Sequence, residues 1–128
     1  MLNYRLLILL VAIGLVGFRP PLPMAERVPA ALIEGEAGIC GWEGKIAVAH
    51  VYQRNSNWNS NSRARPTRES IRAGIEWPYE KDYSNGAVYL WSLSDVQLPA
   101  VQAIIRQEGL RMVSYIKCRG GLALVGYN

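Results

Sequence analysis

Three carboxylates at the start of an apolar helix are the residues of this chain best suited to chemistry. Glu34, Glu36 and Glu43 lie among glycines in the stretch from Ile33 to Asn55. The segment that follows them is apolar on nearly every side, so it must be buried in a core. A carboxyl at the edge of a core can have a raised pKa and act as a general acid near neutral pH. The stretch therefore predicts a site of acid–base chemistry.

The three carboxylates are not equivalent. Glu43 falls in the first turn of the expected helix, where a negative charge interacts favourably with the helix dipole. Glu34 is two residues from Glu36, so on a helix the two side chains point to different faces and do not form a dyad. We expect Glu34 to be solvated.

Nucleophilic and metal-based catalysis are not expected. The chain has a single histidine, His50. If Cys40 and His50 lie on one helix, they are about 15 Å apart and on different faces, so they cannot form a Cys–His dyad. One histidine and two distant cysteines do not make a zinc site of the usual kind. We therefore expect no metal and no cofactor.

The N-terminus predicts export. Met1–Arg5 carries one positive charge, and Leu6–Phe18 is uninterrupted apolar sequence. This run is shorter than the roughly 20 residues of a membrane span and typical of the apolar part of a signal peptide. We expect residues 1–25 to be a signal peptide or a short N-terminal membrane anchor that acts through residues 6–18. Residues 26–128 are then one small domain.

The two cysteines leave two alternatives open. In an exported protein Cys40 and Cys118 can form a disulfide. Closing so long a loop would stabilise the fold by about 4 kcal/mol on the chain-entropy model. Two free, buried thiols are the other alternative.

Apolar periodicity and helix signals predict a small, mostly helical α+β domain with a minor antiparallel sheet. We expect Thr67 to cap the third helix, and Ser94 or Asp95 to cap the fourth. The expected helices are 26–37, which starts near Pro29, and 42–54, 67–77 and 98–107. The expected strands are 86–92, 112–116 and 122–127, the last two around a hairpin turn at 118–121.

Aromatic composition and charge each leave two interpretations open. The rings can fill the core or line a ligand site, and the basic residues can form a solvated surface or bind an anionic partner. The chain has four Trp and seven Tyr but a single Phe, and its net charge is +4. Trp and Tyr join an apolar face to a polar handle and line sugar and base sites. Without a long Lys/Arg block, this charge suits an anionic polymer such as a cell wall, or a membrane surface, rather than nucleic acid. The candidate sugar-stacking residues, each of which could instead pack on the core, are Tyr89, Trp91, Trp58 and Tyr83.

The segment Gly35–Asn55, G-E-A-G-I-C-G-W-E-G-K-I-A-V-A-H-V-Y-Q-R-N, resembles the opening motif of the SleB/CwlJ-type cell-wall hydrolases, roughly G-E-A-(R)-G-E-x-x-E-G-Q-x-A-V-A-x-V-x-x-N-R. The segment Asn85–Ser92 is similar to the family's G-A-T-H-F-Y-N segment, and Gly120–Gly121 to its closing glycine–aromatic hairpin. The resemblance implies a lysozyme-like, lytic-transglycosylase-like catalytic domain. It also implies cleavage of the peptidoglycan glycan strand between MurNAc and GlcNAc, with Glu36 as the catalytic residue, in the cell wall or the extracellular or periplasmic space.

The chain departs from the family motifs at defined positions. Tyr89 stands where the family has its histidine, and Ser92 where it has asparagine. A Q-F-S-containing segment of the family has no counterpart between the first helix pair and the G-A strand. These departures motivate an alternative, a catalytically impaired binding module for wall glycans on the same fold. A third hypothesis, a membrane-anchored structural protein, depends on the apolar N-terminus alone.

Glycosidic cleavage needs an acid that protonates the leaving oxygen. A transglycosylase can use one Glu as acid and then base, with the muramoyl 6-hydroxyl closing on C1. An inverting hydrolase needs a second carboxylate about 6.5–9.5 Å away. Asp95 and Asp82 are the candidates for it. One clear Glu favours the transglycosylase route.

Overall fold

The chain forms a small, mostly helical α+β domain, as the sequence predicts. The computed structural model describes Pro23, residues 26–55, Trp58 and residues 61–127. The expected signal or anchor segment, residues 1–25, lies outside the described residues except for Pro23. No helix within the described part of the chain is long and apolar enough to cross a bilayer.

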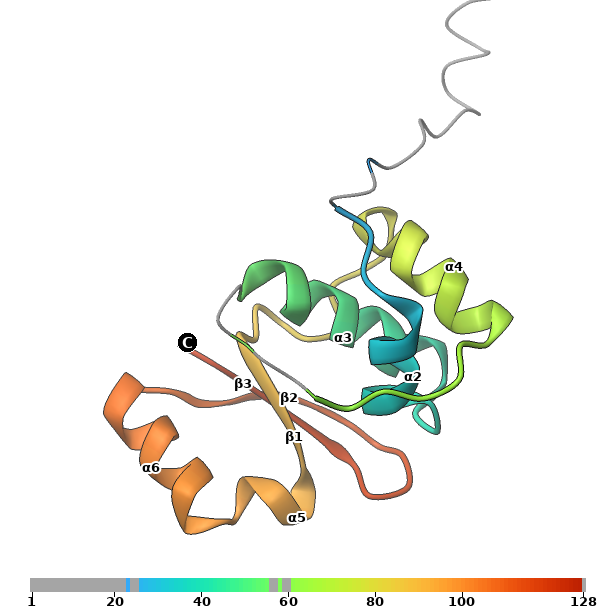
Figure 1. Ribbon diagram of the computed structural model, residues 1–128. Coiled ribbons are helices and arrows are strands. Elements are labelled where there is room, and N and C mark those ends of the chain that lie inside the picture. The colour runs from blue at the N-terminus through green and yellow to red at the C-terminus, as the bar shows by residue number, and fades with distance from the viewer. Residues whose placement is uncertain (1–22, 24–25, 56–57, 59–60, 128) are drawn as a thin grey trace, which may run out of the picture.

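Three helices gather on one side of a small sheet, and the other two lie apart from them (Figure 1). Thr67 caps the third helix as expected, and it does so in a capping box: Ser70 N donates to Thr67 Oγ1, and Thr67 N donates to Ser70 Oγ. The α-helices are α2 (Ala30–Ala37), α3 (Gly41–Arg54), α4 (Arg68–Glu76), α5 (Leu93–Val96) and α6 (Pro99–Glu108). A 3₁₀ turn that contains Pro78, η2 (Trp77–Tyr79), follows α4 directly.

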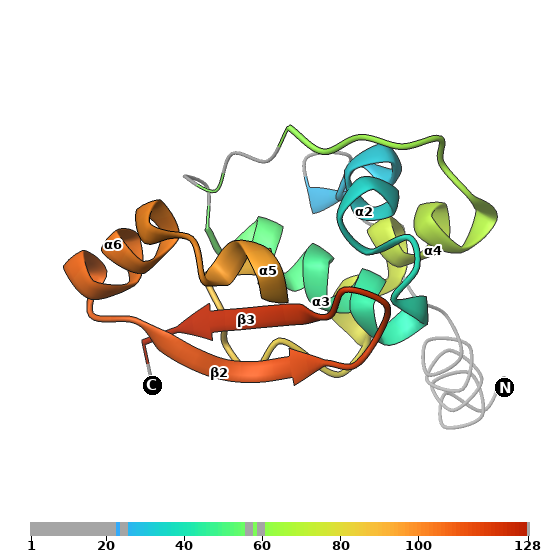
Figure 2. The same cartoon turned by 90° about the horizontal axis from the view of Figure 1, so that it is seen from below.

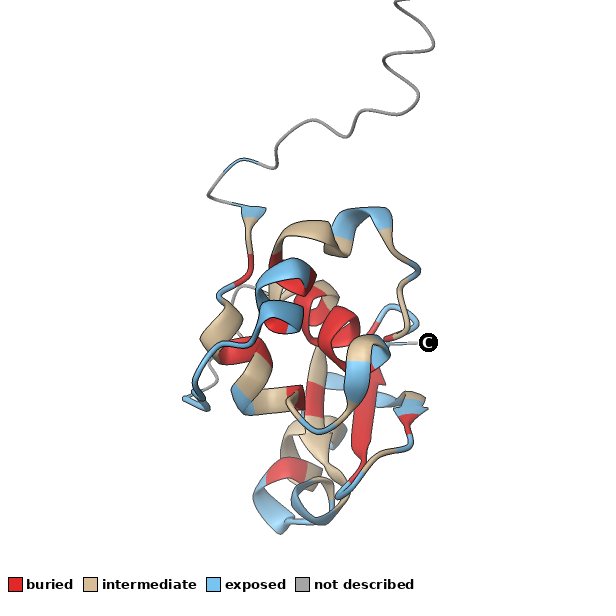
Figure 3. Ribbon diagram, turned by 90° about the vertical axis from the view of Figure 1, so that its right-hand side faces the viewer, coloured by how far each residue is buried: buried red, intermediate tan, exposed pale blue. Residues whose placement is uncertain are grey.

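Helix α3 is the centre of the core. It contacts α2, α4, η2 and the first strand, and it is red along much of its length in the burial view (Figure 3). Its apolar residues from Ile46 to Ala49, together with Val51, are completely buried. Burial on all sides explains why this stretch of sequence lacks a polar face.

The sheet is antiparallel and has the strand order β1–β3–β2. Its strands are β1 (Tyr89–Ser92), β2 (Arg111–Ile116) and β3 (Leu122–Gly126). The central strand β3 pairs on both edges and all five of its residues are buried, so its sequence is continuously apolar. Seen from below, β2 and β3 form the long hairpin that the sequence predicts (Figure 2).

Two local expectations are wrong. The first strand begins at Tyr89, three residues later than expected, because residues 83–86 form a turn. Neither Ser94 nor Asp95 caps the helix that follows: Ser92 accepts from Asp95 N and starts the separate short helix α5. The N-cap of α6 is Leu98, which makes no side-chain cap, and Pro99 follows it in the first turn.

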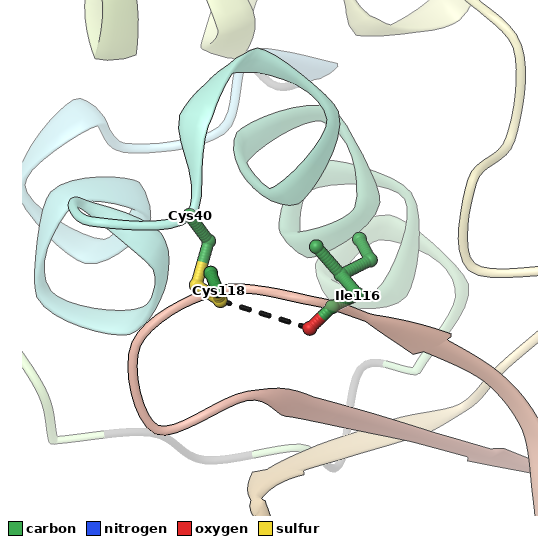
Figure 4. Close-up of a disulfide and its surroundings, with 3 residues drawn as sticks. All are labelled: Cys40, Ile116 and Cys118. Carbon is green, nitrogen blue, oxygen red and sulfur yellow. Dashed lines mark hydrogen bonds between the residues drawn. A yellow bond between two sulfur atoms is a disulfide. The ribbon is translucent and has the colours of Figure 1, made fainter.

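A disulfide joins Cys40, in the turn before α3, to Cys118, in the hairpin turn between β2 and β3 (Figure 4). The two Cα atoms are 5.0 Å apart, although the residues are separated by 78 positions in the sequence. The sulfur of Cys118 lies 3.7 Å from the carbonyl oxygen of Ile116. Of the two alternatives for the cysteines, the structure has the disulfide, and it connects the helical side of the domain to the sheet.

Replacing both cysteines with alanine is expected to lower the free energy of unfolding by about 4 kcal/mol, because the unfolded chain regains the freedom of a 78-residue loop. Urea unfolding followed by tryptophan fluorescence measures the change. Reduced wild-type protein is the control and should lose a similar amount of stability. An unchanged urea midpoint for the double variant would contradict the prediction.

Candidate active site

A cleft of about 710 Å³ opens between the helical side of the domain and the sheet. One part of its lining comes from α2 and the turn after it. Another part comes from the hairpin residues Arg119–Leu122, near the C-terminal end of the sequence. Trp58 and Ser62 come from the loop after α3, and the remaining lining residues, from Leu90 to Ser92 and Asp95, come from β1 and α5. A cleft of this size is in the range that holds a small ligand or a segment of a polymer.

Glu36 lies in the last turn of α2 and lines the cleft. Its neighbour Ala37 is buried, as are Leu32 and Ile33 one turn earlier, so the apolar side of α2 fixes which way the helix faces. Glu36 itself is half-buried. The residue to which the family resemblance assigns catalysis is therefore at the surface of a concave site.

The expectation that Glu34 is solvated is wrong. Its side chain is only 10% exposed, and its Oε1 lies 2.8 Å from Lys45 Nζ. Thr67 Oγ1 donates a hydrogen bond of 2.5 Å to the same oxygen. Lys45, whose side chain is 6% exposed, also pairs with Glu69 at 2.9 Å. One buried cation thus joins α2, α3 and α4.

This ion pair keeps Glu34 charged. Burial alone would raise the pKa of Glu34, but the hydrogen bonds from Lys45 and Thr67 and the charge of Lys45 outweigh burial and hold the pKa below its ordinary value of 4.5. The two carboxylates likewise raise the pKa of Lys45, against the effect of its burial. A carboxylate that remains ionised has no proton to donate near neutral pH. Glu34 lines the cleft but is unsuited to act as the acid.

Gly35, between the two glutamates, lets the loop after α3 lie directly against α2. A Cβ at this position would stand 2.7 Å from the backbone of Ser62 and Arg63, which is closer than real contacts allow. Ala64 N also donates to the carbonyl oxygen of Ala31 at 3.0 Å. These contacts hold Ser62 at the wall of the cleft that Glu36 also lines.

Two of the four candidate aromatic residues line the cleft. Trp91 does so from β1, and Trp58 from the loop after α3. Trp58 also packs against the core, with its ring edge-on to Tyr52 at a centroid distance of 6.4 Å. The two alternatives weighed for Trp58, ligand contact and packing on the core, are therefore compatible.

Tyr89 and Tyr83 do not line this cleft. The ring of Tyr89 stacks on Trp91 at 5.1 Å, and its hydroxyl donates to Glu108 at 3.0 Å. Tyr83 lines a separate pocket, together with Glu43, on another part of the domain. Their positions support no direct role for either tyrosine beside Glu36.

The two aspartates are in different surroundings. Asp95 is exposed and lines the cleft from the first turn of α5. Asp82 lies outside the cleft, where it pairs with Arg54 and accepts a hydrogen bond from the Ser84 hydroxyl. Burial would raise the pKa of Asp82, but Ser84 and Arg54 outweigh it and the pKa is lowered. Asp95 alone of the two is placed to act with Glu36.

The remaining candidates have structural surroundings. Glu43 is exposed in the first turn of α3. His50 packs edge-on to Trp77, its buried Nε2 has no hydrogen-bond partner among the described residues, and burial lowers its pKa. Among the described residues, no group of three or more His, Cys, Asp or Glu side chains could hold a metal ion.

Sequence reasoning missed two charged residues of this region. Lys45 directly precedes the apolar run of α3, and its burial next to Glu34 is a contact between two helices that no local pattern indicates. Arg119 was part of the expected hairpin turn, and it lines the cleft. Its position depends on the disulfide at Cys118, which sequence analysis left open.

Comparisons with known proteins add no identification. No model of a known protein family, no curated protein and no solved structure matches this chain. The resemblance to the cell-wall hydrolases therefore depends on the motif residues alone.

Replacing Glu34 with glutamine is expected to destabilise the fold by about 3 kcal/mol at neutral pH, because buried Lys45 loses a charged partner. In the wild type, the stabilisation from Glu34 is present above pH 4.5 and is lost as the pH falls through the lowered pKa of the folded state. The variant should therefore show a weaker loss of stability in acid. Urea unfolding at a series of pH values measures both effects.

The control for this prediction is Glu43→Gln, which removes an exposed carboxylate at a helix start and should cost under about 1 kcal/mol. Equal losses of stability for the two variants would contradict the prediction that the buried Glu34–Lys45 pair stabilises the fold more than an exposed carboxylate does.

Proposed function

We propose that this protein is an exported enzyme that cleaves the peptidoglycan glycan strand between MurNAc and GlcNAc as a lytic transglycosylase. The observation that carries the proposal is that Glu36, Asp95, Trp58 and Trp91 line one cleft. A carboxyl group and aromatic rings in a concave site are what a glycosidase needs. A cleft between a helical side and an antiparallel sheet also supports a lysozyme-like fold, which is part of the proposal.

In the proposed reaction Glu36 acts first as an acid and then as a base. Its carboxyl protonates the glycosidic oxygen as the bond to C1 of MurNAc breaks, so GlcNAc leaves with a free 4-hydroxyl. The resulting carboxylate accepts the proton of the muramoyl 6-hydroxyl as that oxygen closes on C1. The product is a 1,6-anhydro ring, no water is consumed, and Glu36 ends in its starting protonation state.

Asp95 provides an alternative second step. If it activates a water molecule against C1, the enzyme is an inverting hydrolase and the product has a reducing end. Asp95 is exposed in a short helix, whereas Glu36 is half-buried. The proposal gives Asp95 no necessary part in the reaction.

Several features together support the proposals that the protein is exported and that it binds the cell wall. The apolar N-terminus is typical of a signal peptide, and a disulfide is compatible with an oxidising compartment without requiring it. The net charge of +4 suits an anionic wall.

The alternative is a binding module that holds wall glycans without cleaving them. Its support comes from the two departures from the family motif. Ser92 lines the cleft, but Tyr89 points its hydroxyl to Glu108 outside it. Tyr89 in place of the family's histidine therefore removes no group from the cleft, and this favours the enzyme over the binding module.

Purified protein is expected to release soluble muropeptides from cell-wall sacculi, and Glu36→Gln to reduce the rate at least about 10³-fold, because the amide cannot donate a proton. Release is measured by chromatography of the supernatant. Two matched carboxylate controls, Glu43→Gln and Glu108→Gln, should retain activity.

Three outcomes separate the hypotheses. An active Glu36→Gln variant contradicts the mechanism. Wild-type protein that sediments with sacculi without dissolving them supports the binding module. Protein that neither binds nor dissolves sacculi contradicts both hypotheses.

Trp91→Leu is expected to raise KM for glycan strands about tenfold with a smaller effect on kcat, because loss of one stacking surface weakens substrate binding. Tyr83→Leu removes an aromatic ring outside the cleft and should leave KM unchanged. Steady-state rates on soluble glycan strands measure both. An equal rise in KM for the two variants would place the binding surface elsewhere.

A further inference from the structure

Arg119 is a cation of the cleft that has no partner within the described residues. It lines the same cleft as Glu36 and Asp95. Lys45, Arg54 and Arg72 form ion pairs, whereas the side chain of Arg119 makes no hydrogen bond, ion pair or ring contact with the described residues. Its five N–H donors are therefore available to a ligand.

The turn that carries Arg119 is held at both ends. On one side, the disulfide joins the preceding residue, Cys118, to Cys40, which follows α2 and also lines the cleft. On the other side, Leu93 N donates to the carbonyl oxygen of Gly120 at 3.2 Å. A fixed backbone reduces the entropy that Arg119 loses when it binds a ligand.

The tight packing of this turn requires Gly121. Its φ is +67°, and a Cβ there would stand 2.9 Å from the side chains of Leu93 and Tyr115. Gly121 N also donates to the carbonyl oxygen of Cys118 at 2.9 Å. The backbone next to Arg119 therefore packs closely against Leu93 of α5 and Tyr115 of β2.

The charges of the cleft indicate what Arg119 would bind. Besides Glu34, which pairs with Lys45, the charged residues that line the cleft are Glu36, Asp95 and Arg119. A strand of neutral amino sugars offers hydroxyl and acetamido groups, which do not need a cation. A muramoyl residue adds a lactyl group, which ends in a free carboxylate or carries a peptide that has carboxylates of its own. The planar guanidinium matches a carboxylate with two parallel hydrogen bonds.

We propose that Arg119 binds a carboxylate carried by the muramoyl residue and so makes the cleft selective for acidic over neutral glycans. The inference deepens the proposed function and depends on it. The selectivity therefore depends on whether the glycan carries a free carboxylate.

Binding to the Glu36→Gln protein, in which turnover is blocked, tests the inference by calorimetry. The probes are peptide-free MurNAc–GlcNAc strands, the same strands with the lactyl carboxylate converted to the amide, and peptide-bearing strands. We expect the peptide-free acidic strands to bind about tenfold more tightly than the amidated strands. Adding Arg119→Gln should abolish this difference without weakening binding of the amide, and Arg119→Lys should keep part of it.

The matched control is Arg111→Gln, which removes the same charge from an exposed position on β2 outside the cleft. It should preserve the selectivity. A preference shown only by peptide-bearing strands, and lost with Arg119, would assign the carboxylate to the peptide and support the inference.

Two results overturn the inference while the proposed function stands: equal weakening of acidic and amidated strands by Arg119→Gln, or the same effect from Arg111→Gln. Absence of binding by every strand would overturn both the inference and the proposed function.

Discussion

A buried ion pair between Glu34 of α2 and Lys45 of α3 is the constraint on which the rest of the structure depends. Helix α2 has only eight residues, and isolated helices of that length are not stable. Its place is set by packing and by Lys45, whose buried charge would keep only the partly exposed Glu69 as a partner if the helix turned about its axis. Glu36, half a turn further along, takes its orientation from this constraint.

Helix α3 then fixes both walls of the cleft relative to each other. At its N-terminal end, Cys40 holds the hairpin turn through the disulfide. At its C-terminal end, Arg54 donates to the carbonyl oxygen of Ala87 at 2.6 Å, and Asn55 to that of Val88 at 2.6 Å. The chain is thus tied to α3 immediately before it enters β1, the strand that carries Trp91. Residues far apart in sequence meet at the cleft because the segments that carry them are all attached to α3.

Local signals were sufficient for most of the elements. Thr67 and Pro78 bracket α4, and the apolar run that ends at Val51 is the buried centre of α3. The strands β2 and β3 follow from the glycine pair between them. Failures occurred where local signals compete, as at residues 92–95, where Ser92 rather than Ser94 or Asp95 supplies the cap.

The site was predictable only in part. Glu36 was identified through a motif and lines the cleft, and its catalytic role stays a prediction. Glu34 was taken as solvated because Lys45 and Thr67 are distant in sequence, and no pattern within one helix reveals that they meet. The position of Arg119 was not predictable either, because it depends on the disulfide between Cys40 and the neighbouring Cys118, which are 78 positions apart in the sequence. Tertiary structure decides which charged residues pair across two elements. Helix caps and apolar periodicity, in contrast, can be predicted from residues that are neighbours in the sequence.

The central claim is that one carboxyl, Glu36, is both acid and base in a cleft that binds the glycan strand. The most direct test is the mass spectrum of the muropeptides released from sacculi by the wild-type protein. The account predicts products that end in the 1,6-anhydro ring, lighter than the hydrolysed products by one water molecule. Products that end only in reducing sugars would contradict it, because a water molecule and a second catalytic group would then be required.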